Sequence, residues 1–260
     1  TAYTQTLFST QVFEFENPLD SGSSGLLRSF EAGASESDAM YSKLGNAVVF
    51  IASVPGQGRQ LWINSGDEQE RIEIPNDINP TVFTWTHQQQ LLLADANSRR
   101  ILTLDPTSGD TRYLTTTIPK MGLFQLNSAG DKLYYSKMIA QQFQLFEYDV
   151  NTGTEKQLTT TGGFYMQLSQ DGQNLYFNRY NEAGLWKLSL STLETEVVLD
   201  DFHHLNHSVW QLFDDGIYYR RDPSSARGLY FYDFTTKHHS SFLQGKEIYH
   251  FDVSPDQSRV

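Results

Sequence analysis

The stretch Gly163–Asp200 reads GFYMQLSQDGQNLYFNRYNEAGLWKLSLSTLETEVVLD. It holds four short segments rich in aromatic and β-branched residues: 164–169, 175–180, 185–190 and 195–199. Apolar and polar residues alternate in them, which favours strands over helices. Asp171-Gly172, between the first two segments, is a strong signal for a hairpin. The stretch therefore predicts an antiparallel sheet of four strands.

The same pattern recurs along the chain. An apolar residue opens the second strand of each repeat every 42 or 43 residues, at Val48, Leu91, Leu133, Leu175, Ile217 and Val260. Repeats of about 40–45 residues with four strands each are typical of β-propeller blades. We therefore predict an all-β fold, a six-bladed β-propeller with four-stranded antiparallel blades, in a single domain that covers residues 1–260.

The two ends of the chain fit the repeat incompletely. The expected blades are residues 37–75, 80–116, 121–160, 163–200 and 206–244, with a last blade made of 248–260 plus 1–33. Residues 26–30 suit an outermost strand, and the C-terminal residues suit a first strand and the start of a second. We expect strands from both termini to close the last blade, because closure removes two exposed sheet edges.

Composition limits the possible partners. The chain has 31 acidic and 19 basic residues, with a formal net charge of −12, which argues against direct binding to nucleic acid or to an anionic membrane surface. It has no cysteine, so disulfides, thiol nucleophiles and cysteine-ligated metal sites are excluded. No run approaches the roughly 20 apolar residues of a membrane-spanning helix. Because the sequence begins with Thr1, we expect it to be a part of a longer protein.

Sequence motifs for catalysis are missing. There is no G-x-S-x-G elbow, no phosphate-binding glycine loop and no H-E-x-x-H pair. His203, His204 and His207 form the one notable cluster, with His250 one repeat further on. Propeller lyases that act on oligogalacturonate use a histidine-lined metal site, but these histidines fall in a loop between blades and lack a supporting carboxylate spacing. We expect no catalytic residue, no metal and no cofactor.

A binding site is expected where the innermost strands begin, at the mouth of the central channel. Ten residues before each repeat position lie mostly polar residues, and the candidate binding residues are Asp38, Thr81, Tyr165, His207 and His250. The alternative is that they form only the solvated ends of these strands. Neighbouring positions are more apolar. They include Leu168 and Trp210, which we expect at equivalent positions of successive inner strands, buried between blades.

The sequence motif of the repeat resembles that of a known family. Residues 169–177 (SQDGQNLYF) and 254–256 (SPD) resemble the PD40, or TolB-like, propeller repeat. Residues 210–256 are similar to the C-terminal propeller of CadC/ToxR-like membrane-bound winged-helix transcriptional regulators, notably at 216–219 (GIYY) and 230–234 (YFYDF). Gln257 departs from the family pattern, which usually has glycine there.

The resemblance implies a non-catalytic periplasmic sensor or protein-interaction domain of an inner-membrane protein. Such a domain would bind an unknown protein or small-molecule signal, would not contact nucleic acid itself, and would be tethered to the membrane through a segment absent from this chain. Two alternatives stay open. One is a free-standing TolB-like periplasmic scaffold, and the other is a propeller lyase or the gating propeller of a prolyl-oligopeptidase-type enzyme.

Overall fold

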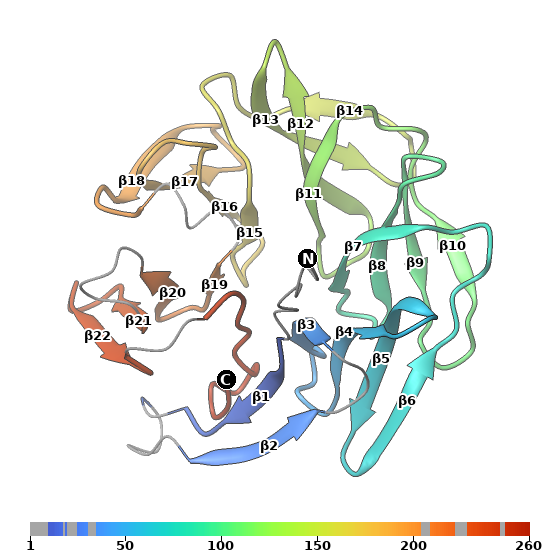
Figure 1. Cartoon of the computed structure of the whole chain (residues 1–260). Helices are drawn as coiled ribbons and strands as arrows, with labels where there is room; N and C mark the ends of the chain where they lie inside the picture. Colours follow the sequence, from blue (N-terminus) through green and yellow to red (C-terminus); the bar gives the residue numbers. More distant parts are fainter. Residues whose placement is uncertain are drawn as a thin grey trace, which may run out of the picture. The chain divides into compact units, whose positions relative to one another are not determined.

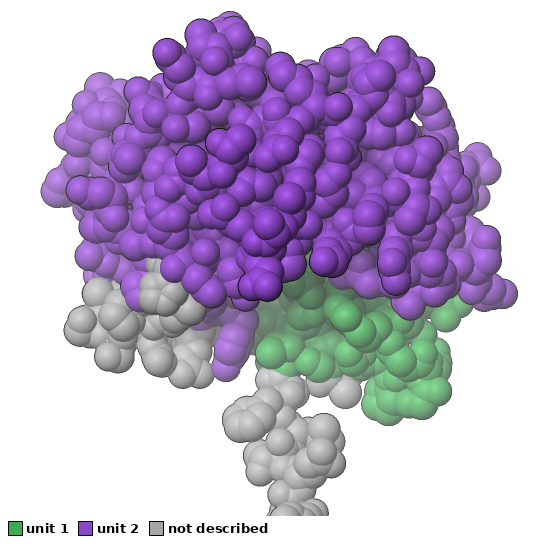
Figure 2. All heavy atoms as spheres, turned by 90° about the horizontal axis from the view of Figure 1, so that it is seen from above, with its two compact units in different colours: residues 1–73, 250–260 green, residues 74–249 purple. Residues whose placement is uncertain are grey.

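The structure, a computed structural model, describes residues 10–17, 19, 25–30, 35–203, 209–221, 228–244 and 248–260. The chain divides into two compact units, coloured separately in Figure 2. Unit 1 comprises residues 1–73 and 250–260, and unit 2 comprises residues 74–249. Within the described ranges no helix is both long and apolar enough to cross a membrane.

Unit 1 contains one four-stranded antiparallel sheet and one two-stranded sheet (Figure 1). The larger sheet is β3 (Ser35–Tyr41), β4 (Val48–Val54), β5 (Gly58–Ser65) and β6 (Glu68–Ile72). The smaller one pairs β1 (Val12–Phe15) with β2 (Leu26–Phe30).

Unit 2 contains four sheets, each with four strands bonded in chain order. The first two are β7 (Pro80–Trp85), β8 (Leu91–Asp95), β9 (Arg100–Leu104), β10 (Thr111–Tyr113), and β11 (Met121–Leu126), β12 (Lys132–Ile139), β13 (Gln142–Asp149), β14 (Glu155–Gln157). The others are β15 (Met166–Leu168), β16 (Asn174–Phe177), β17 (Leu185–Ser189), β18 (Thr195–Leu199), and β19 (Trp210–Leu212), β20 (Gly216–Arg221), β21 (Gly228–Asp233), β22 (His239–Phe242). The first strands β7, β11, β15 and β19 lie on the inner side of the arc that these sheets follow in Figure 1.

The prediction of six blades is wrong, because the described residues form five four-stranded blades. The missing blade was expected from residues 248–260 and the N-terminus. Of this blade, the described C-terminal residues form the turn expected between its first two strands: the N–H of Ser254 donates to the carbonyl of Arg259 at 2.9 Å, and the N–H of Arg259 donates to the Ser254 hydroxyl at 2.9 Å.

The two ends of the chain nevertheless pair within unit 1. Phe15 and Val260 exchange both main-chain hydrogen bonds, at 2.7 and 2.9 Å, and Glu16 and Arg259 form an isolated antiparallel bridge. The C-terminal residues therefore lie beside β1, but they extend a sheet of two strands and do not complete a blade of four.

The turn between the first and second strands of the repeat has a recurring physical basis. The hydroxyls of Ser42, Ser169 and Ser254 each accept the N–H of the fifth residue beyond, at 3.2, 3.0 and 2.9 Å. At the equivalent turns the Thr86 hydroxyl accepts the N–H of the fourth residue beyond, Gln90, and the Asn127 side-chain oxygen accepts that of the fifth, Lys132, each at 3.1 Å. Short polar side chains that bond nearby main chain favour such turns over continued strands. At Ser169 and Ser254 the hydroxyl also donates to the Asp two residues on, at 2.5 and 2.6 Å, which explains the Ser-x-Asp motif at these two turns.

The core lies between neighbouring sheets of unit 2, because side chains alternate between the two faces of each strand. Leu133 and Tyr135 of β12 pack with Leu92 and Ile101 of the preceding sheet. Tyr134, between them in sequence, packs with Leu175 and the rest of the following sheet's core. A one-residue change of register would therefore exchange the side chains that these two cores receive from β12.

One predicted column of the core needs correction. Leu168 pairs with Leu175, as the repeat predicts, but Trp210 pairs with Tyr219 and it is Leu212 that pairs with Ile217. Trp210 therefore corresponds to Met166, which pairs with Phe177. The reason is that the turn between β19 and β20 is two residues shorter than its counterpart between β15 and β16, so equal spacing in sequence does not give equal position in the sheet.

Candidate functional site

Polar side chains on the innermost strands of unit 2 bind the main chain of the next sheet. The Gln125 Oε1 on β11 accepts the N–H of Leu168 at 2.8 Å. The Gln167 Oε1 on β15 accepts the N–H of Leu212 at 2.8 Å, and its Nε2 donates to the Trp210 carbonyl at 2.7 Å. Leu168 and Leu212 occupy the same register position in successive sheets. These glutamines thus satisfy main-chain groups that no strand partner reaches.

Asp252 makes the equivalent contact in unit 1. Its Oδ2 accepts the N–H of Tyr41 at 2.7 Å, and Tyr41 pairs with Val48 at the register position that Leu168 and Leu212 hold in unit 2. Burial raises the pKa of the Asp252 carboxyl to about 7, while the hydrogen bond from Tyr41 and the nearby Lys43 ammonium lower it. Asp252 is therefore a carboxyl group that titrates near neutral pH.

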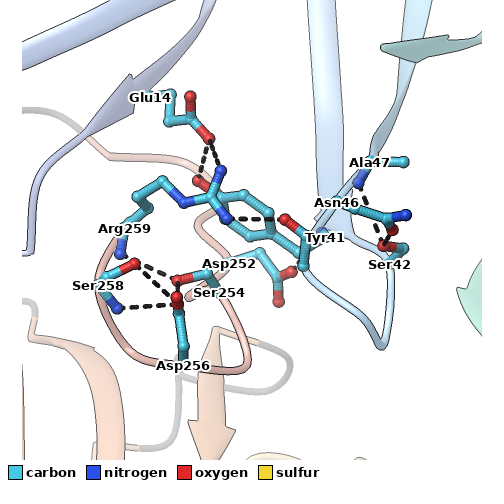
Figure 3. A network of polar contacts seen from close by, with 11 residues as sticks. Glu14, Tyr41, Ser42, Asn46, Ala47, Asp252, Ser254, Asp256, Ser258 and Arg259 are labelled. Carbon is cyan, nitrogen blue, oxygen red and sulfur yellow. Dashed lines mark hydrogen bonds and ion pairs between the residues drawn. The ribbon is translucent and has the colours of Figure 1, made fainter. Parts of the chain in front are cut away.

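A second polar network lies beside this contact (Figure 3). Glu14 of β1 is 4% exposed, and its Oε1 accepts the Tyr41 hydroxyl at 2.8 Å and lies 3.3 Å from Arg259 Nη1. The Arg259 Nη2 donates to the Gly45 carbonyl at 2.7 Å, and its guanidinium carbon lies 5.3 Å from the centre of the Tyr41 ring. Burial and the Glu14 carboxylate raise the pKa of the Tyr41 phenol. The network joins β1, β3 and the C-terminal residues.

Lys43 adds a cation to the same part of unit 1. It follows β3, in the turn that begins at Ser42, and its side chain reaches solvent. The surrounding protein lowers the pKa of its ammonium, and the Asp252 carboxylate acts in the opposite direction. Lys43 and a protonated Asp252 can both donate hydrogen bonds, so this pair suits a ligand group that accepts them.

The candidate residues Asp38 and Thr81 contribute to bulges in first strands. Asp38 lies in β3 with a φ of 54°, where the register shifts between Ser37 and Met40, and it accepts the Ser37 hydroxyl at 2.8 Å. Thr81 lies in β7 at a second register shift, and its hydroxyl donates to the Ala94 carbonyl at 3.3 Å. Asp38 belongs to unit 1 and Thr81 to unit 2.

Tyr165 packs against the core of the neighbouring sheet. Its ring meets that of Trp210 edge to face at 5.0 Å, and its hydroxyl accepts the Gln167 Nε2 at 2.7 Å. His250 lies half-buried in unit 1, ahead of Asp252. His207 lies outside the described residues. The structure thus brings Tyr165 together with Trp210 and Gln167, and the use of the five positions as a ligand site remains a prediction.

Most of the predicted histidine cluster lies outside the described residues. Of its members His203 is described, and His204 and His207 lie outside the described residues. Across the residues that the structure places, no group of three or more His, Asp or Glu side chains is arranged to hold a metal ion.

Carboxylates with lowered pKa values are found mainly in turns. Asp105, Asp149 and Asp233 each use Oδ1 to accept two main-chain N–H groups, at 2.7–3.0 Å, in the turn after the third strand. Lys132 and the turn N–H of Thr152 hold the pKa of Asp149 at about 2. The N–H groups of their turns lower the pKa of Asp105 and Asp233. These shifts arise from turn formation.

Sequence reasoning missed the Gln125, Gln167 and Asp252 contacts. These residues stand two positions after the candidate column, where the repeat also places Met40, Phe83 and Val209, so no uniform polar pattern marks them. The Glu14–Arg259 pair was also missed, since no periodicity links residues so far apart in the chain.

Comparison with known proteins agrees on the fold. No family model matches the sequence, and no curated protein sequence matches it. Solved structures do match. The TolB structure from Agrobacterium tumefaciens has a TM-score of 0.68 at 15% identity, over 96% of this chain and 95% of that one. TolB from Acinetobacter baumannii has a TM-score of 0.66 at 12% identity, over 90% of this chain and 64% of that one, so this chain spans less than two thirds of its length.

An enzyme shares the fold as well. The oligogalacturonate lyase from Vibrio parahaemolyticus has a TM-score of 0.56 at 10% identity, over 84% of this chain and 83% of that one. At such identities the likeness concerns the fold alone, and the fold hosts more than one activity. The chain therefore has a TolB-like β-propeller fold.

Proposed function

We propose that this chain is a non-catalytic binding domain and that it serves as the periplasmic sensor of a transmembrane transcriptional regulator. The non-catalytic binding role is supported by the hydrogen bonds that polar side chains near the inner strands make. Gln125, Gln167 and Asp252 hold the main chain of neighbouring strands, and the acidic residues with lowered pKa values build turns. Side chains committed in this way form a rigid scaffold on which a ligand can bind.

The regulator role rests on the resemblance of residues 210–256 to the propeller of CadC/ToxR-like regulators. The net charge of −12 is consistent with it, since a domain of this charge is repelled by DNA. DNA binding and membrane attachment would then belong to parts of the protein outside this chain.

The ligand site within this proposal is the Lys43–Asp252 pair of unit 1. The Lys43 side chain reaches solvent beside a carboxyl group that titrates near neutral pH, so the pair can donate hydrogen bonds to a carboxylate, carbonyl or phosphate oxygen. A ligand there would change signalling only through different affinities for two states of the whole receptor. Because the scaffold is strongly hydrogen-bonded, we propose that the two receptor states differ in domain orientation or in dimerisation.

The test uses the complete reading frame that encodes these residues. Expressed in its source organism with and without residues 10–260, it should regulate its neighbouring genes differently under envelope stress, pH change and nutrient shift. Equal regulation and equal response by both versions would contradict the sensor role and favour the second candidate, a free-standing TolB-like periplasmic scaffold. That candidate is supported by the likeness to two TolB structures.

The enzyme alternative has its own test. Protein purified without a histidine tag should contain substoichiometric transition metal and should release no unsaturated product from oligogalacturonate. One zinc or manganese per chain, lost in His207→Ala, would place the lyase interpretation first.

A further inference from the structure

An exposed aromatic cluster lies at one end of two neighbouring sheets of unit 2. Phe143 of β13 meets Phe164, which precedes β15, with ring centres 4.7 Å apart. Tyr180, which follows β16, lies 5.8 Å from Phe143 and 5.2 Å from Phe164. Tyr180 is 51% exposed, and the two phenylalanines are half-buried. These three contacting rings thus lie at the surface, whereas most aromatic residues of unit 2 lie in the core.

The β12–β13 hairpin supplies the rest of this surface. Its strands are eight residues long, and it turns at Ala140 and Gln141, whose φ angles of 47° and 67° are those of a two-residue hairpin turn. Met138 stands directly opposite Phe143 in the ladder, so both side chains lie on one face of the hairpin. We call Met138, Phe143, Phe164 and Tyr180 the aromatic patch.

The aromatic patch is held in place before any partner arrives. The N–H of Gly163 donates to the Phe143 carbonyl at 2.9 Å, and the N–H of Phe164 donates to the Asn178 carbonyl at 2.8 Å. A Cβ on Gly163 would meet Leu145 Cγ at 2.5 Å, so only glycine allows this close approach. Aromatic and methionine side chains are enriched at the centres of protein interfaces. Side chains that are already fixed before binding lose little conformational entropy when a partner binds.

The charges around the patch indicate what it binds. Arg179 donates to Glu182 at 2.7 Å, so these two charges offset each other. Lys120 is exposed, its carbonyl accepts the N–H of Met138 at 3.1 Å, and no ion pair to it is formed within the described ranges. The cation beside the patch is therefore available to a partner.

The acidic turns of the same sheet are too distant to cancel this cation. Asp131 and Asp149 lie at the other end of β12 and β13, and eight residues of strand span roughly 26 Å. That distance is about three Debye lengths at physiological ionic strength, so their field at the patch is largely screened. A partner at the patch meets aromatic rings and a lysine despite the net charge of the chain.

We infer that the aromatic patch with Lys120 is a docking surface for an acidic protein segment that inserts an aromatic or aliphatic side chain between the rings. The segment's carboxylates would lie near Lys120, and its apolar side chain would cover Tyr180. This surface is built by elements different from the Lys43–Asp252 pair, and its existence does not depend on the sensor role.

The test is selection of a displayed library of random 12-residue peptides against the intact chain. Selected peptides should carry an aromatic or aliphatic anchor and more Asp and Glu than Lys and Arg. Their affinity should fall at least tenfold in Tyr180→Ala and at least fivefold in Lys120→Glu, and it should weaken as salt is raised. The matched control is Tyr249→Ala, which removes another tyrosine of unit 2, 68% exposed, and should change affinity less than twofold.

Several outcomes would overturn the inference. These are selected peptides with a basic excess, peptides that bind Tyr180→Ala as tightly as the parent, no selected peptide at all, or Tyr180-dependent binding of neutral oligosaccharides in place of peptides. Circular dichroism and thermal unfolding establish that each variant is folded. Lys120→Glu changes only an exposed side chain, so it provides the test even if Tyr180→Ala is unstable.

Discussion

Glu14 and Arg259 form an ion pair with 3.3 Å between Oε1 and Nη1, although 245 positions separate them in the sequence. The pair joins β1 to the C-terminal end, and the Glu14 carboxylate is almost completely buried. The Tyr41 hydroxyl donates to Glu14, and Arg259 donates to the Gly45 carbonyl. Unit 1 therefore depends on contacts between the first and last parts of the chain.

Replacing Arg259 with Met should destabilise unit 1 by about 3 kcal/mol, because it leaves the buried Glu14 carboxylate without its cation. Urea unfolding measures this change. The additional change Glu14→Gln should recover part of the loss, since it removes the unpaired charge. As a control, Arg71→Met disrupts the exposed Arg71–Glu73 pair and should cost less than about 0.5 kcal/mol. Equal losses in the two Arg variants would contradict the account of the network.

Asp252 should make stability depend on pH. Its pKa of about 7 in the folded protein lies above the ordinary value of 3.8, so the folded state binds the proton more tightly than the unfolded state. The resulting stabilisation is fully present below about pH 4 and is lost as pH rises through 7, by roughly 4 kcal/mol at most.

Asp252→Asn should remove this dependence while keeping an oxygen to accept the Tyr41 N–H. The measurement is the difference in unfolding free energy between parent and variant from pH 4 to pH 8. This difference cancels the opposite trend of Asp95 and Asp149, whose pKa values are about 2 and which lose stabilisation only as pH falls. A difference that does not change with pH would show that Asp252 is ionised throughout.

Trp210→Ala should cost about 3–5 kcal/mol, because the side chain is 2% exposed and packs on Tyr165 and Phe202. Leu168→Ala, at a half-buried position, should cost about half as much. A reversible denaturant titration compares them. If Trp210→Ala lowers the free energy of unfolding by less than about 1 kcal/mol, the Trp210 side chain does not stabilise the core between these sheets.

Gln167→Ala should destabilise unit 2 by about 1–3 kcal/mol, because the Leu212 N–H and the Trp210 carbonyl lose their partner. Gln88 offers a matched control, since it also bonds the next sheet, through the Ser128 carbonyl, but in an exposed position. Gln88→Ala should cost less than about 0.5 kcal/mol. If the two variants lose equal stability, the inner-strand glutamines have no special role.

The strands could be predicted from the sequence because their determinants are local. Alternation recurs every 42 or 43 residues, short polar side chains close the first turn of four of the five described four-stranded sheets, and each of these sheets starts close to its expected position. The number of blades could not be predicted in the same way. It depends on pairing between the two ends of the chain, and the repeat does not show that residues 258–260 meet β1 through a few main-chain contacts only.

The candidate site was less accessible to sequence reasoning. The column of positions was laid out by equal spacing, and a turn shortened by two residues displaces Trp210 within its sheet. The polar groups that matter, Gln167 and Asp252, differ in chemistry and are recognised only by their main-chain partners. Contacts between sheets depend on register, which a repeat length does not fix.

The central claim, that this chain binds a signal through the Lys43–Asp252 pair and passes it to a regulator, has one direct test. A transcriptional reporter of the neighbouring genes should be followed in cells that express the complete reading frame as the parent, as Lys43→Ala, and as Lys156→Ala, which changes another exposed lysine and serves as the surface control. We predict that Lys43→Ala loses the response to the inducing condition at equal protein level, whereas Lys156→Ala keeps it. A full response from Lys43→Ala, and from a protein lacking residues 10–260, would contradict the claim.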